Sequence, residues 1–482
     1  MMNNVAHISQ ALPGAGKTQA FIDHVADGEL ERGIVLALPT LKLVNDVHER
    51  LWGAGVDTIK ITSETGSGTS HAVEMVLDDR REDDPLVLVV THACLRLIDP
   101  MCLVGWNLVI DEVPDISNTG SLTIWKATFE TFCEPYIDID EGGLTTLKAG
   151  NKALFEKVSE EHSKDKFIVA ASVFNALVDS DVDVYVKYQK AKGNYRMGCV
   201  GFHDYVECFR CADESHLLGH AVERSLLYLH LEASGFEFKE SRYQPEFQSY
   251  KMSPTLVPLY KGDRFSKTVL LTNDKGEAKT TWESDVSGEK VIDNAMGHNG
   301  TASILTQVHS WCEYDFSDEH MIQTGFDARG LNTFTGVNRT LNLIHGNSSG
   351  IEDGLNSMML GRMGIDEKRG KAAIHYSRCL EMMIQHICRT SIRTFEAQTV
   401  PTVHYVPNES MAEQIAEALK IDCEIDRSIM IDPPKRVTEA KANREAKKSQ
   451  AKALLAEGKQ KKEIAEFLGV TPRTITNWLK AS

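Results

Sequence analysis

Residues 5–21 have the sequence VAHISQALPGAGKTQAF, in which an apolar segment leads into a glycine-rich loop and then into a helical pattern. Gly14 and Gly16 allow a tight turn whose backbone N–H groups point at phosphate oxygens. A helix that begins at Lys17 adds the partial positive charge of its N-terminus. Lys17 can reach the outer phosphates of a nucleotide, and the Thr18 hydroxyl can bind Mg²⁺. The stretch therefore predicts a phosphate-binding loop that follows a buried strand.

Three further apolar runs follow in the first part of the chain, at residues 33–40, 85–92 and 106–112. Each is rich in Val, Ile and Leu, and helical patterns separate them. Short continuous runs of this kind are typical of parallel strands that are buried on both faces of a sheet. We therefore expect an α/β fold with a doubly wound parallel sheet in the first lobe.

The alternation of strands and helices stops after residue 116 and resumes near residue 267. Helical patterns dominate the intervening stretch, so we expect a mainly helical insertion there. Strand-like runs then return and indicate a second α/β lobe, which a charged linker joins to a short C-terminal domain. The predicted division is a first lobe at 1–116 completed by 263–280, an insertion at 117–262, a second lobe at 281–431, a linker at 432–450 and a C-terminal domain at 451–482.

An acidic pair ends one of the apolar runs, in LVIDEV at 108–113. A carboxylate at the end of a strand beside a phosphate-binding loop can hold Mg²⁺, and a second one can orient or deprotonate a water molecule. We assign the first role to Asp111 and the second to Glu112. The pair favours nucleoside triphosphate hydrolysis coupled to work over a small-molecule kinase, which lacks the hydrolytic carboxylate.

The charge of the chain is unevenly distributed. The 482 residues carry a formal net charge of −17. Residues 433–482 alone hold 12 Lys and Arg against 5 Asp and Glu, whereas the remainder holds 40 against 64. A basic tail on an acidic body indicates either contact with a polyanion or a solvated tail. The ten scattered cysteines suit a reducing cytoplasm, and we expect a cytoplasmic protein with no membrane segment.

With these motifs on one chain, the sequence resembles the superfamily 2 helicases and translocases of the DExD/H type. Their phosphate loop commonly begins with Ala, as it does here at Ala11, and Ala15 lies within the matching loop. The resemblance places Pro39, Thr40 and Thr91 on the nucleic-acid backbone. It also places Thr272, in VLLTND at 269–274, in the motif that couples ATP hydrolysis to unwinding.

The resemblance continues in the second lobe and implies two RecA-like lobes that share one ATP. FDARGLNTF at 326–334 is similar to a motif that touches both ATP and nucleic acid, through Gly330 and Asn332. QHICRTSIR at 385–393 is similar to the motif that carries the arginine finger, a guanidinium that stabilises charge on the transferring phosphoryl group. We expect Gln385, Arg389 and Arg393 to lie on one helix, and either arginine can be the finger. Cys388 replaces the usual Gly. The spelling is close to bacteriophage DEAD-like helicases.

The C-terminal residues 452–482 resemble a helix-turn-helix of the resolvase or sigma-factor type. Gly469 suits a left-handed turn between two helices, and Thr471 with Pro472 suits the start of the second one. The spacing predicts that Ile464 and Trp478 pack the helices together. The outward residues suit duplex DNA, although a helical appendage that binds protein is the alternative. The predicted DNA contacts are Arg473, Thr474, Thr476, Asn477 and Lys480.

One segment of the insertion contains candidate metal ligands. A Cys-x-x-Cys pair with two nearby histidines can bind Zn²⁺ as two thiolates and two imidazoles. The alternative is that the cysteines pack in a core, because the spacing is short and no second pair follows. The four residues are Cys208, Cys211, His203 and His216.

The sequence leads to one main hypothesis and two rivals. The main one is an ATP- and Mg²⁺-dependent DNA helicase or translocase, phage-encoded and acting in DNA replication or recombination in the cytoplasm of a bacterial host. Its partners are single-stranded or forked DNA for the motor and duplex DNA for the C-terminal domain, and RNA remains open for the motor. The rivals are an ATP-switched, sequence-specific DNA-binding initiator or regulator that does not unwind, and a packaging or nuclease-linked ATPase.

Overall fold

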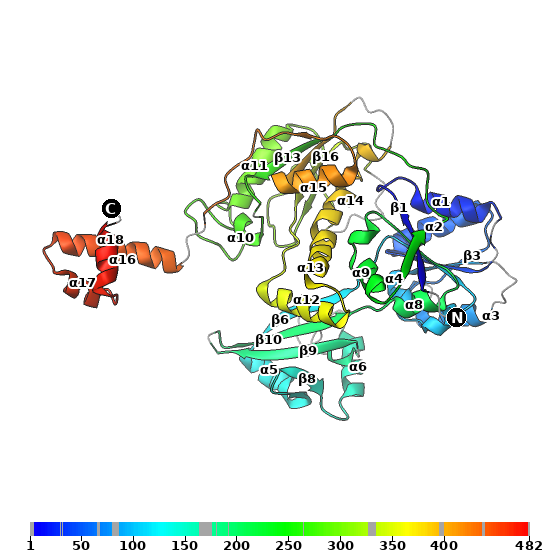
Figure 1. Cartoon of the computed structure of the whole chain (residues 1–482), viewed down its shortest axis with the longest axis horizontal. Coiled ribbons are helices and arrows are strands. Elements are labelled where there is room, and N and C mark those ends of the chain that lie inside the picture. The colour runs from blue at the N-terminus through cyan, green and yellow to red at the C-terminus, as the bar shows by residue number, and fades with distance from the viewer. Residues whose placement is uncertain are drawn as a thin grey trace.

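The computed structural model of the chain (Figure 1) describes all residues except 1–3, 29, 31, 65–67, 80–85, 163–175, 180, 191, 264, 326–333, 395–399, 436–438 and 481–482. These described residues form two α/β lobes, an inserted sheet on one side of them, and a separate helical domain at the C-terminus. None of the helices in the described part combines the length and the apolar character needed to cross a lipid bilayer.

The first lobe is built on a seven-stranded parallel sheet in the order β12-β1-β11-β5-β2-β4-β3. Alternate residues of its strands enter two different cores: Val35 and Leu88 lie in one, whereas Leu36 and Val89 lie in the other. Burial on both faces explains the continuous apolar runs in the sequence. The strands are β1 (Val5–Gln10), β2 (Ile34–Leu38), β3 (Thr58–Lys60), β4 (Val87–Thr91), β5 (Asn107–Asp111), β11 (Ser215–Gly219) and β12 (Glu237–Glu240).

Helices cover both faces of this sheet and follow the carboxyl ends of its strands (Figure 1). In α2, Val44, Val47 and Leu51 share the buried face, and Thr40 caps the helix by accepting a hydrogen bond from the Leu43 amide. The helices of the first lobe are α1 (Lys17–Ala26), α2 (Leu41–Gly53), α3 (Thr69–Asp79), α4 (His92–Leu95), α8 (Val206–Cys211) and α9 (Leu226–Ala233).

The insertion contains a five-stranded antiparallel sheet in the order β6-β10-β9-β8-β7, and α5 and α6 pack on one of its faces. The expectation of a mainly helical insertion was therefore wrong. Its strands alternate buried and accessible side chains with a period of two, and the exposed polar residues of β6 hid that pattern. The elements are β6 (Ser117–Trp125), α5 (Lys126–Phe132), β7 (Ile137–Ile139), β8 (Leu144–Leu147), α6 (Lys152–His162), β9 (Val182–Gln189) and β10 (Asn194–Phe202).

The second lobe contains a six-stranded parallel sheet in the order β15-β14-β16-β17-β13-β18. Cores lie on both faces of this sheet, as in the first lobe. Its strands are β13 (Thr255–Tyr260), β14 (Ile304–Val308), β15 (Met321–Gln323), β16 (Arg339–Leu343), β17 (Val403–Asn408) and β18 (Glu424–Ile425), and its helices are α10 (Lys267–Leu270), α11 (Ser287–Asn299), α14 (Glu381–Ile387) and α15 (Glu409–Leu419). Helices α12 (Gly350–Arg362) and α13 (Glu367–His375) lie in the same stretch of the chain, but their buried side chains belong to the core of the first lobe.

The observed division differs from the predicted one at both ends of the insertion. Residues 215–219 and 237–240 return to the first sheet, so the inserted sheet itself spans 117–202. Residues 263–280 do not complete the first lobe, because α10 packs with the second-lobe core. Strand β13 escaped prediction because Pro258 lies inside it, and proline is usually excluded from central strands.

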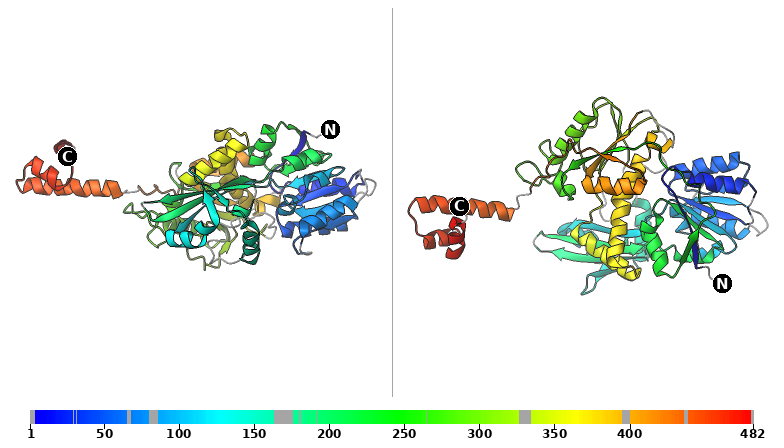
Figure 2. Two further views of the ribbon diagram at one scale, coloured as in Figure 1. Left: turned by 90° about the horizontal axis from the view of Figure 1, so that it is seen from below. Right: turned by 45° about the horizontal axis from the view of Figure 1, so that its top comes forward.

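The C-terminal domain consists of α16 (Glu439–Ala456), α17 (Lys461–Phe467) and α18 (Pro472–Lys480), and it stands clear of the two lobes in both views of Figure 2. Its small core contains Ile464, Ala465, Ile475 and Trp478, as the spacing predicted. Gly469 has a positive φ of 62° at the turn between α17 and α18. The helix-turn-helix prediction is therefore confirmed.

Candidate functional site

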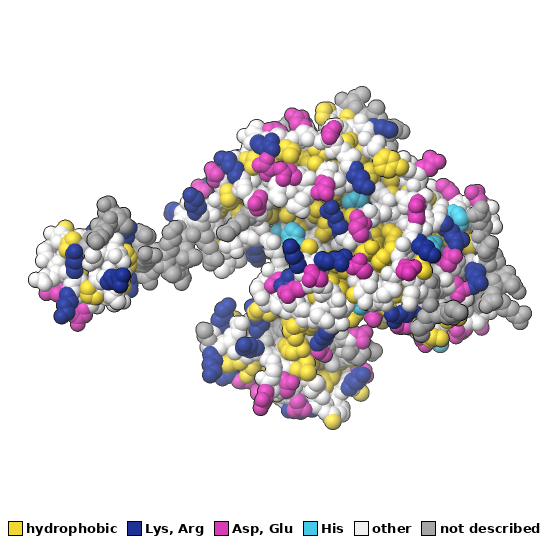
Figure 3. All heavy atoms as spheres, viewed as in Figure 1, with side chains coloured by type: hydrophobic (Ala, Val, Ile, Leu, Met, Phe, Trp, Pro, Cys, Tyr) yellow, Lys and Arg dark blue, Asp and Glu magenta, His cyan; other side chains and the backbone are white. Residues whose placement is uncertain are grey.

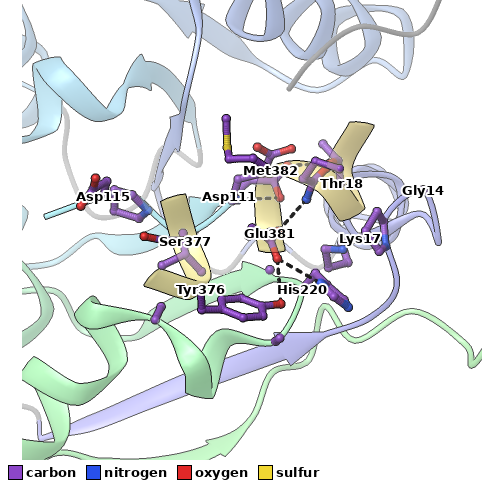
Figure 4. Close-up of a pocket in the computed structure, with 18 of the residues that line it drawn as sticks. Gly14, Lys17, Thr18, Asp111, Asp115, His220, Tyr376, Ser377, Glu381 and Met382 are labelled. Atoms are coloured by element: carbon purple, nitrogen blue, oxygen red, sulfur yellow. Dashed lines mark hydrogen bonds and ion pairs between the residues drawn. The ribbon is translucent and has the colours of Figure 1, made fainter. Parts of the chain in front are cut away.

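A cavity of about 370 Å³ lies between the two lobes. On the first-lobe side it is bordered by the loops that follow β1, β5 and β11, because the carboxyl ends of neighbouring parallel strands meet at one edge of a sheet. On the second-lobe side it is bordered by residues 376–393. The lining includes Gly14, Gly16, Lys17, Thr18, Asp111, Glu112, His220, Tyr376, Glu381, Gln385, Arg389 and Arg393 (Figure 4).

The glycine-rich loop adopts the conformation that the sequence predicts. Gly14 and Gly16 have φ values of 83° and 84°, and α1 begins at Lys17. The Lys17 Nζ donates to the backbone oxygen of Ala11 at 2.9 Å and to that of Leu12 at 3.3 Å. Burial lowers the pKa of this lysine, and the nearby carboxylates oppose that shift. A buried ammonium group at a helix N-terminus is a site that suits a polyanionic ligand.

The two residues that were predicted to bind Mg²⁺ through side-chain oxygen atoms, Thr18 and Asp111, are in contact. The Thr18 hydroxyl donates to Asp111 Oδ2 at 2.5 Å, and Asp111 is only 2% exposed. Burial raises the pKa of Asp111, whereas the bond from Thr18 and the charge of Lys17 lower it. A hydroxyl and a carboxylate are hard ligands of the kind Mg²⁺ prefers, so these residues fit the ion. Glu112 follows with a positive φ of 60°, which is uncommon for a residue other than glycine.

Three second-lobe side chains, Gln385, Arg389 and Arg393, line the cavity together with the glycine-rich loop. Arg393 lies against the loop so closely that a Cβ added to Gly14 would be 2.6 Å from Arg393 Cγ. Arg389 is 6% exposed, and its Nη2 donates to Gln385 Oε1 at 3.4 Å. The three do not share one helix as expected, since α14 ends at Ile387 and Arg393 lies in a 3₁₀ turn, Ser391–Thr394.

Sequence reasoning missed a group of residues that joins the lobes inside the cavity. Glu381, from the second lobe, accepts hydrogen bonds from Tyr376 Oη and Gln385 Nε2, each at 2.9 Å (Figure 4). It also lies 3.2 Å from Nδ1 of His220, a first-lobe residue. Burial acts to raise the pKa of Glu381, but these partners lower it overall. The buried carboxylate therefore remains charged and ties the two lobes together.

His220 directly follows β11, which lies between β1 and β5 in the sheet. This position brings it to the cavity, whereas Thr272, which was expected to belong to the coupling motif, does not line the cavity. Thr272 belongs to the core side of the second lobe and bonds to the Thr268 backbone oxygen at 2.5 Å, so that prediction was wrong. The strand order would have revealed this residue. Strand β11 lies between β1, which leads into the glycine-rich loop, and β5, which ends in Asp111, so the carboxyl end of β11 must also lie at the cavity.

Tyr250, in the segment that joins the lobes, explains the unusual residue in the second-lobe motif. Its hydroxyl donates to the backbone oxygen of Pro13 at 2.8 Å and lies 3.1 Å from Cys388 Sγ. Cys388 stands where the resembled family has a glycine. Burial raises the pKa of the Cys388 thiol to about 11, so the thiol is neutral at this contact. The Cys388 side chain, which a glycine would lack, thus packs against Tyr250 in the segment that joins the lobes.

The residues predicted to touch the nucleic-acid backbone lie at neighbouring strand ends. Thr91 ends β4 and caps α4, with its hydroxyl accepting from the Cys94 amide at 3.1 Å. Pro39 and Thr40 follow β2, whose Leu38 pairs with Thr91. All three predicted residues are half-buried, and none lines the cavity. Gly330 and Asn332 lie outside the described residues, as does the side chain of Lys480.

The other predicted DNA contacts lie on the last helix. Arg473 and Asn477 are exposed on α18. Thr474 and Thr476 are half-buried, and Thr476 Oγ1 donates to the Pro472 backbone oxygen at 3.0 Å. Thr471 caps the helix by accepting from the Thr474 amide at 3.2 Å. Among the predicted contacts whose side chains the structure describes, Arg473 and Asn477 are therefore the accessible ones.

The structure does not bring the predicted zinc ligands together, and the described residues contain no metal-binding group of three or more His, Cys, Asp or Glu. His203 contacts Arg96 Nη1 at 2.7 Å, whereas His216 is buried in the sheet and lies 2.9 Å from Ser241 Oγ. Cys208 lies in the hydrophobic core, where burial raises its pKa to about 12, and the Cys211 Sγ is 3.9 Å from a methionine sulfur. The zinc prediction was wrong because the cysteines pack as apolar groups.

Two buried histidines predict a pH dependence of the second lobe. Burial lowers the pKa of His386 and of His404 to about 3 each. In the unfolded chain these histidines bind protons below pH 6.5, whereas in the folded protein they remain neutral. The free energy of unfolding is therefore highest above pH 6.5 and decreases as the pH falls below that value. Between pH 7 and pH 5 each histidine should cost about 2 kcal/mol of unfolding free energy.

Thermal unfolding at both pH values should show that His404→Gln loses less stability than the wild type. His71→Gln, at an exposed site, should match the wild type, and equal acid sensitivity in all three would contradict the assignment.

Comparison with known proteins gives one family match, which is confined to the C-terminus. The family described as "Homeodomain-like domain" matches residues 442–482, the range that holds α17, α18 and most of α16. No curated protein sequence matches the chain significantly.

Comparison with solved structures gives alignments over most of the chain, at low identity and with TM-scores below 0.5. Xpd4 of S. tokodaii has a TM-score of 0.42 and 10% identity, over 89% of this chain and 96% of that one. Dbp5 of S. cerevisiae, bound to RNA and ADP BeF3, has a TM-score of 0.35 and 10% identity, over 90% and 86% of the two chains. UvsW of T4 has a TM-score of 0.23 and 9% identity, over 88% and 73%.

Proposed function

We propose that the chain is an ATP-dependent DNA helicase or translocase of the superfamily 2 type. One observation carries the proposal: Lys17, Thr18, Asp111 and Glu112 of one lobe line a single cavity with Gln385, Arg389 and Arg393 of the other. A site divided between two lobes makes hydrolysis depend on how the lobes are arranged. Nucleotide turnover can then drive alternating closure and opening, which is the basis of a motor.

The roles follow from the chemistry of each side chain. Lys17 and the loop amides would hold the phosphates, and Thr18 with Asp111 would hold Mg²⁺, which neutralises charge on the phosphate oxygens. Glu112 would orient or deprotonate the attacking water. An arginine of the second lobe would stabilise the charge that builds on the transferring phosphoryl group. Pro39, Thr40 and Thr91 would contact the nucleic-acid backbone, as would the segment of Gly330 and Asn332.

DNA is the favoured substrate because of the C-terminal domain. A helix-turn-helix presents its last helix to the major groove of a duplex, and residues 433–482 carry an excess of basic residues. The domain would anchor the motor on duplex DNA while the lobes act on a single-stranded or forked segment. The sequence of the second-lobe motif at 385–393 is similar to that of bacteriophage DEAD-like helicases, which extends this proposal to replication or recombination in a bacterial host.

The proposal predicts that nucleic acid stimulates ATP hydrolysis. The rate should rise above the rate without nucleic acid when single-stranded or forked DNA is added, because strand binding to both lobes favours the closed arrangement that completes the site. Steady-state ATPase rates should be compared with no nucleic acid, single-stranded DNA, duplex DNA and RNA. The Lys17→Ala variant provides the background rate in each arm. A wild-type rate that equals this background under all four conditions would refute the assignment, and stimulation by RNA alone would reassign the substrate.

The C-terminal domain also favours a second candidate, an ATP-switched DNA-binding initiator or regulator that does not unwind. The contacts of Glu381 and Tyr250 between the lobes would then stabilise one nucleotide-bound arrangement of the lobes, and the lobes would not step along DNA. Strand displacement on forked DNA separates the two candidates. A motor displaces the strand with ATP, whereas a switch binds the fork and leaves it paired.

A further inference from the structure

The inserted sheet has a second face, opposite the one that packs on α5 and α6. Strand register defines this face, since directly paired residues of antiparallel strands point to the same side. Ile124, Val186 and Met197 enter the core beneath the helices. The residues between them therefore point the other way, in rows across β6, β10 and β9. Two of these rows are Thr119–Val200–Asp183 and Ser121–Gly198–Tyr185, and the next two are Thr123–Arg196–Lys187 and Trp125–Asn194–Gln189.

Helix α12, which follows the second-lobe strand β16 in the chain and packs with the first-lobe core, covers the first two rows. The Thr119 hydroxyl donates to Asn356 Oδ1 at 2.7 Å, and Arg362 forms an ion pair with Asp183. Leu355 lies over Gly198, where a Cβ would be 3.0 Å from its methyl carbons. In Figure 1 α12 lies along this part of the sheet. This half of the face is thus covered by α12 and is closed to other partners.

The last two rows make up the uncovered face, which consists of Thr123, Trp125, Lys187, Gln189, Asn194 and Arg196. Within it Asn194 is buried, and Gln189 and Arg196 are half-buried. Trp125 is 72% exposed, which is unusual for so large an apolar side chain, and Thr123 and Lys187 are also exposed. None of the six residues is acidic, although the whole chain has a net charge of −17. The turn from β9 to β10 adds the exposed Lys190 and Lys192 beside it. Lys and Arg side chains gather over this end of the sheet in Figure 3.

We infer that the uncovered face binds single-stranded nucleic acid, with a base stacked on Trp125 and the flanking phosphates held by Arg196, Lys187 and the lysines of the turn. The inference rests on the proposed function, because it places part of the motor's strand on the insertion. An exposed aromatic ring beside several cations is the combination that binds unpaired strands, since every base has a face to stack and every linkage carries a charge. A duplex would keep its bases stacked and leave Trp125 without a partner.

The geometry of the face suits an extended strand. Three neighbouring β-strands provide a platform about 10 Å across, with the tryptophan and the cations on the same side. The Arg196 Nη2 donates to Ser121 Oγ at 3.2 Å, which orients the guanidinium across the sheet. The platform adjoins the rows that α12 covers, so a bound strand would lie next to the contact between the inserted sheet and α12.

Equilibrium binding of a fluorescent oligo(dT) strand to the full-length, nucleotide-free protein tests the inference. Trp125→Ala should weaken binding by about 5- to 150-fold, the usual effect of losing one stacked base, and Trp125→Phe should restore most of it. With an abasic strand of equal length, wild type and Trp125→Ala should bind alike. A Lys187→Gln, Arg196→Gln double variant should weaken binding of both strands and lower the slope of log affinity against log salt by about 1.4.

Matched controls come from elsewhere on the surface. Trp52→Ala removes a tryptophan that is 69% exposed on α2, and Lys239→Gln removes an exposed cation on β12. Both should bind oligo(dT) like the wild type. If Trp125→Ala and the double variant also bind like the wild type, the uncovered face is not a strand site and the inference is wrong. If the wild type binds no oligo(dT) at all, this inference fails, whereas the motor function is decided separately by the ATPase rates with and without each nucleic acid.

Discussion

Replacing Arg389 and Arg393 together with alanine is expected to lower kcat for ATP hydrolysis by about 10³- to 10⁵-fold. The reason is that the transferring phosphoryl group gains negative charge on its outer oxygens, and in the proposed mechanism a guanidinium from the second lobe would stabilise that charge. Arg393 lies against the glycine-rich loop and Arg389 lines the same cavity, so both are in reach. Steady-state kinetics with saturating ATP and single-stranded DNA measure the effect.

The single variants identify which arginine is the finger. The one whose loss accounts for most of the decrease should not be rescued by lysine, because an ammonium group lacks the planar pair of donors that a guanidinium offers to phosphate. Arg427→Ala provides the control, since Arg427 is an exposed second-lobe arginine paired with Glu409. If the double variant hydrolyses ATP as fast as this control, the second lobe supplies no catalytic charge and the roles of both residues are wrong.

Substituting Glu112 with glutamine is expected to lower the hydrolysis rate by about 10²- to 10⁴-fold and to leave ATP binding nearly unchanged. The amide keeps the size of the side chain but cannot accept the proton of the attacking water. Single-turnover hydrolysis and binding of a fluorescent ATP analogue measure the two quantities separately.

Asp115→Asn is the matched control for that experiment. Asp115 lines the same cavity, but it is exposed and its carboxylate accepts bonds from the amide and hydroxyl of Ser117. It should therefore keep nearly the wild-type rate. A Glu112→Gln variant that turns over ATP as fast as Asp115→Asn would show that water activation lies elsewhere in the cavity.

Much of the first lobe could be predicted because its central strands are buried on both faces. The runs at 33–40, 85–92 and 106–112 became β2, β4 and β5, and the glycine-rich loop led into α1. The C-terminal domain could be predicted from the packing positions of Ile464, Ile475 and Trp478 around Gly469. In both cases local spacing and tertiary burial give the same pattern, so sequence alone is sufficient.

The parts that escaped prediction depend on partners far away in the chain. Strand β11 was hidden because its apolar residues merge with those of α9, and only its pairing with β1 and β5 defines it as a strand. His220 follows from that pairing, so no local motif marks it. Glu381 and Tyr250 are likewise defined by contacts across the interlobe space. The β6 strand has mostly polar residues because only part of one face is buried.

The central claim, that one triphosphate is held by both lobes, is tested most directly by the affinity for a mimic of the phosphoryl transition state. The dissociation constants of ADP and of ADP with aluminium fluoride should be measured, in the presence of Mg²⁺ and single-stranded DNA, for the wild type and the Arg389→Ala, Arg393→Ala double variant. We expect ADP to bind both proteins alike and the tight binding of the aluminium fluoride complex to be lost in the variant, because the arginines act on the transferring group alone. Equally tight binding of the complex by both proteins would show that the second lobe does not reach the nucleotide.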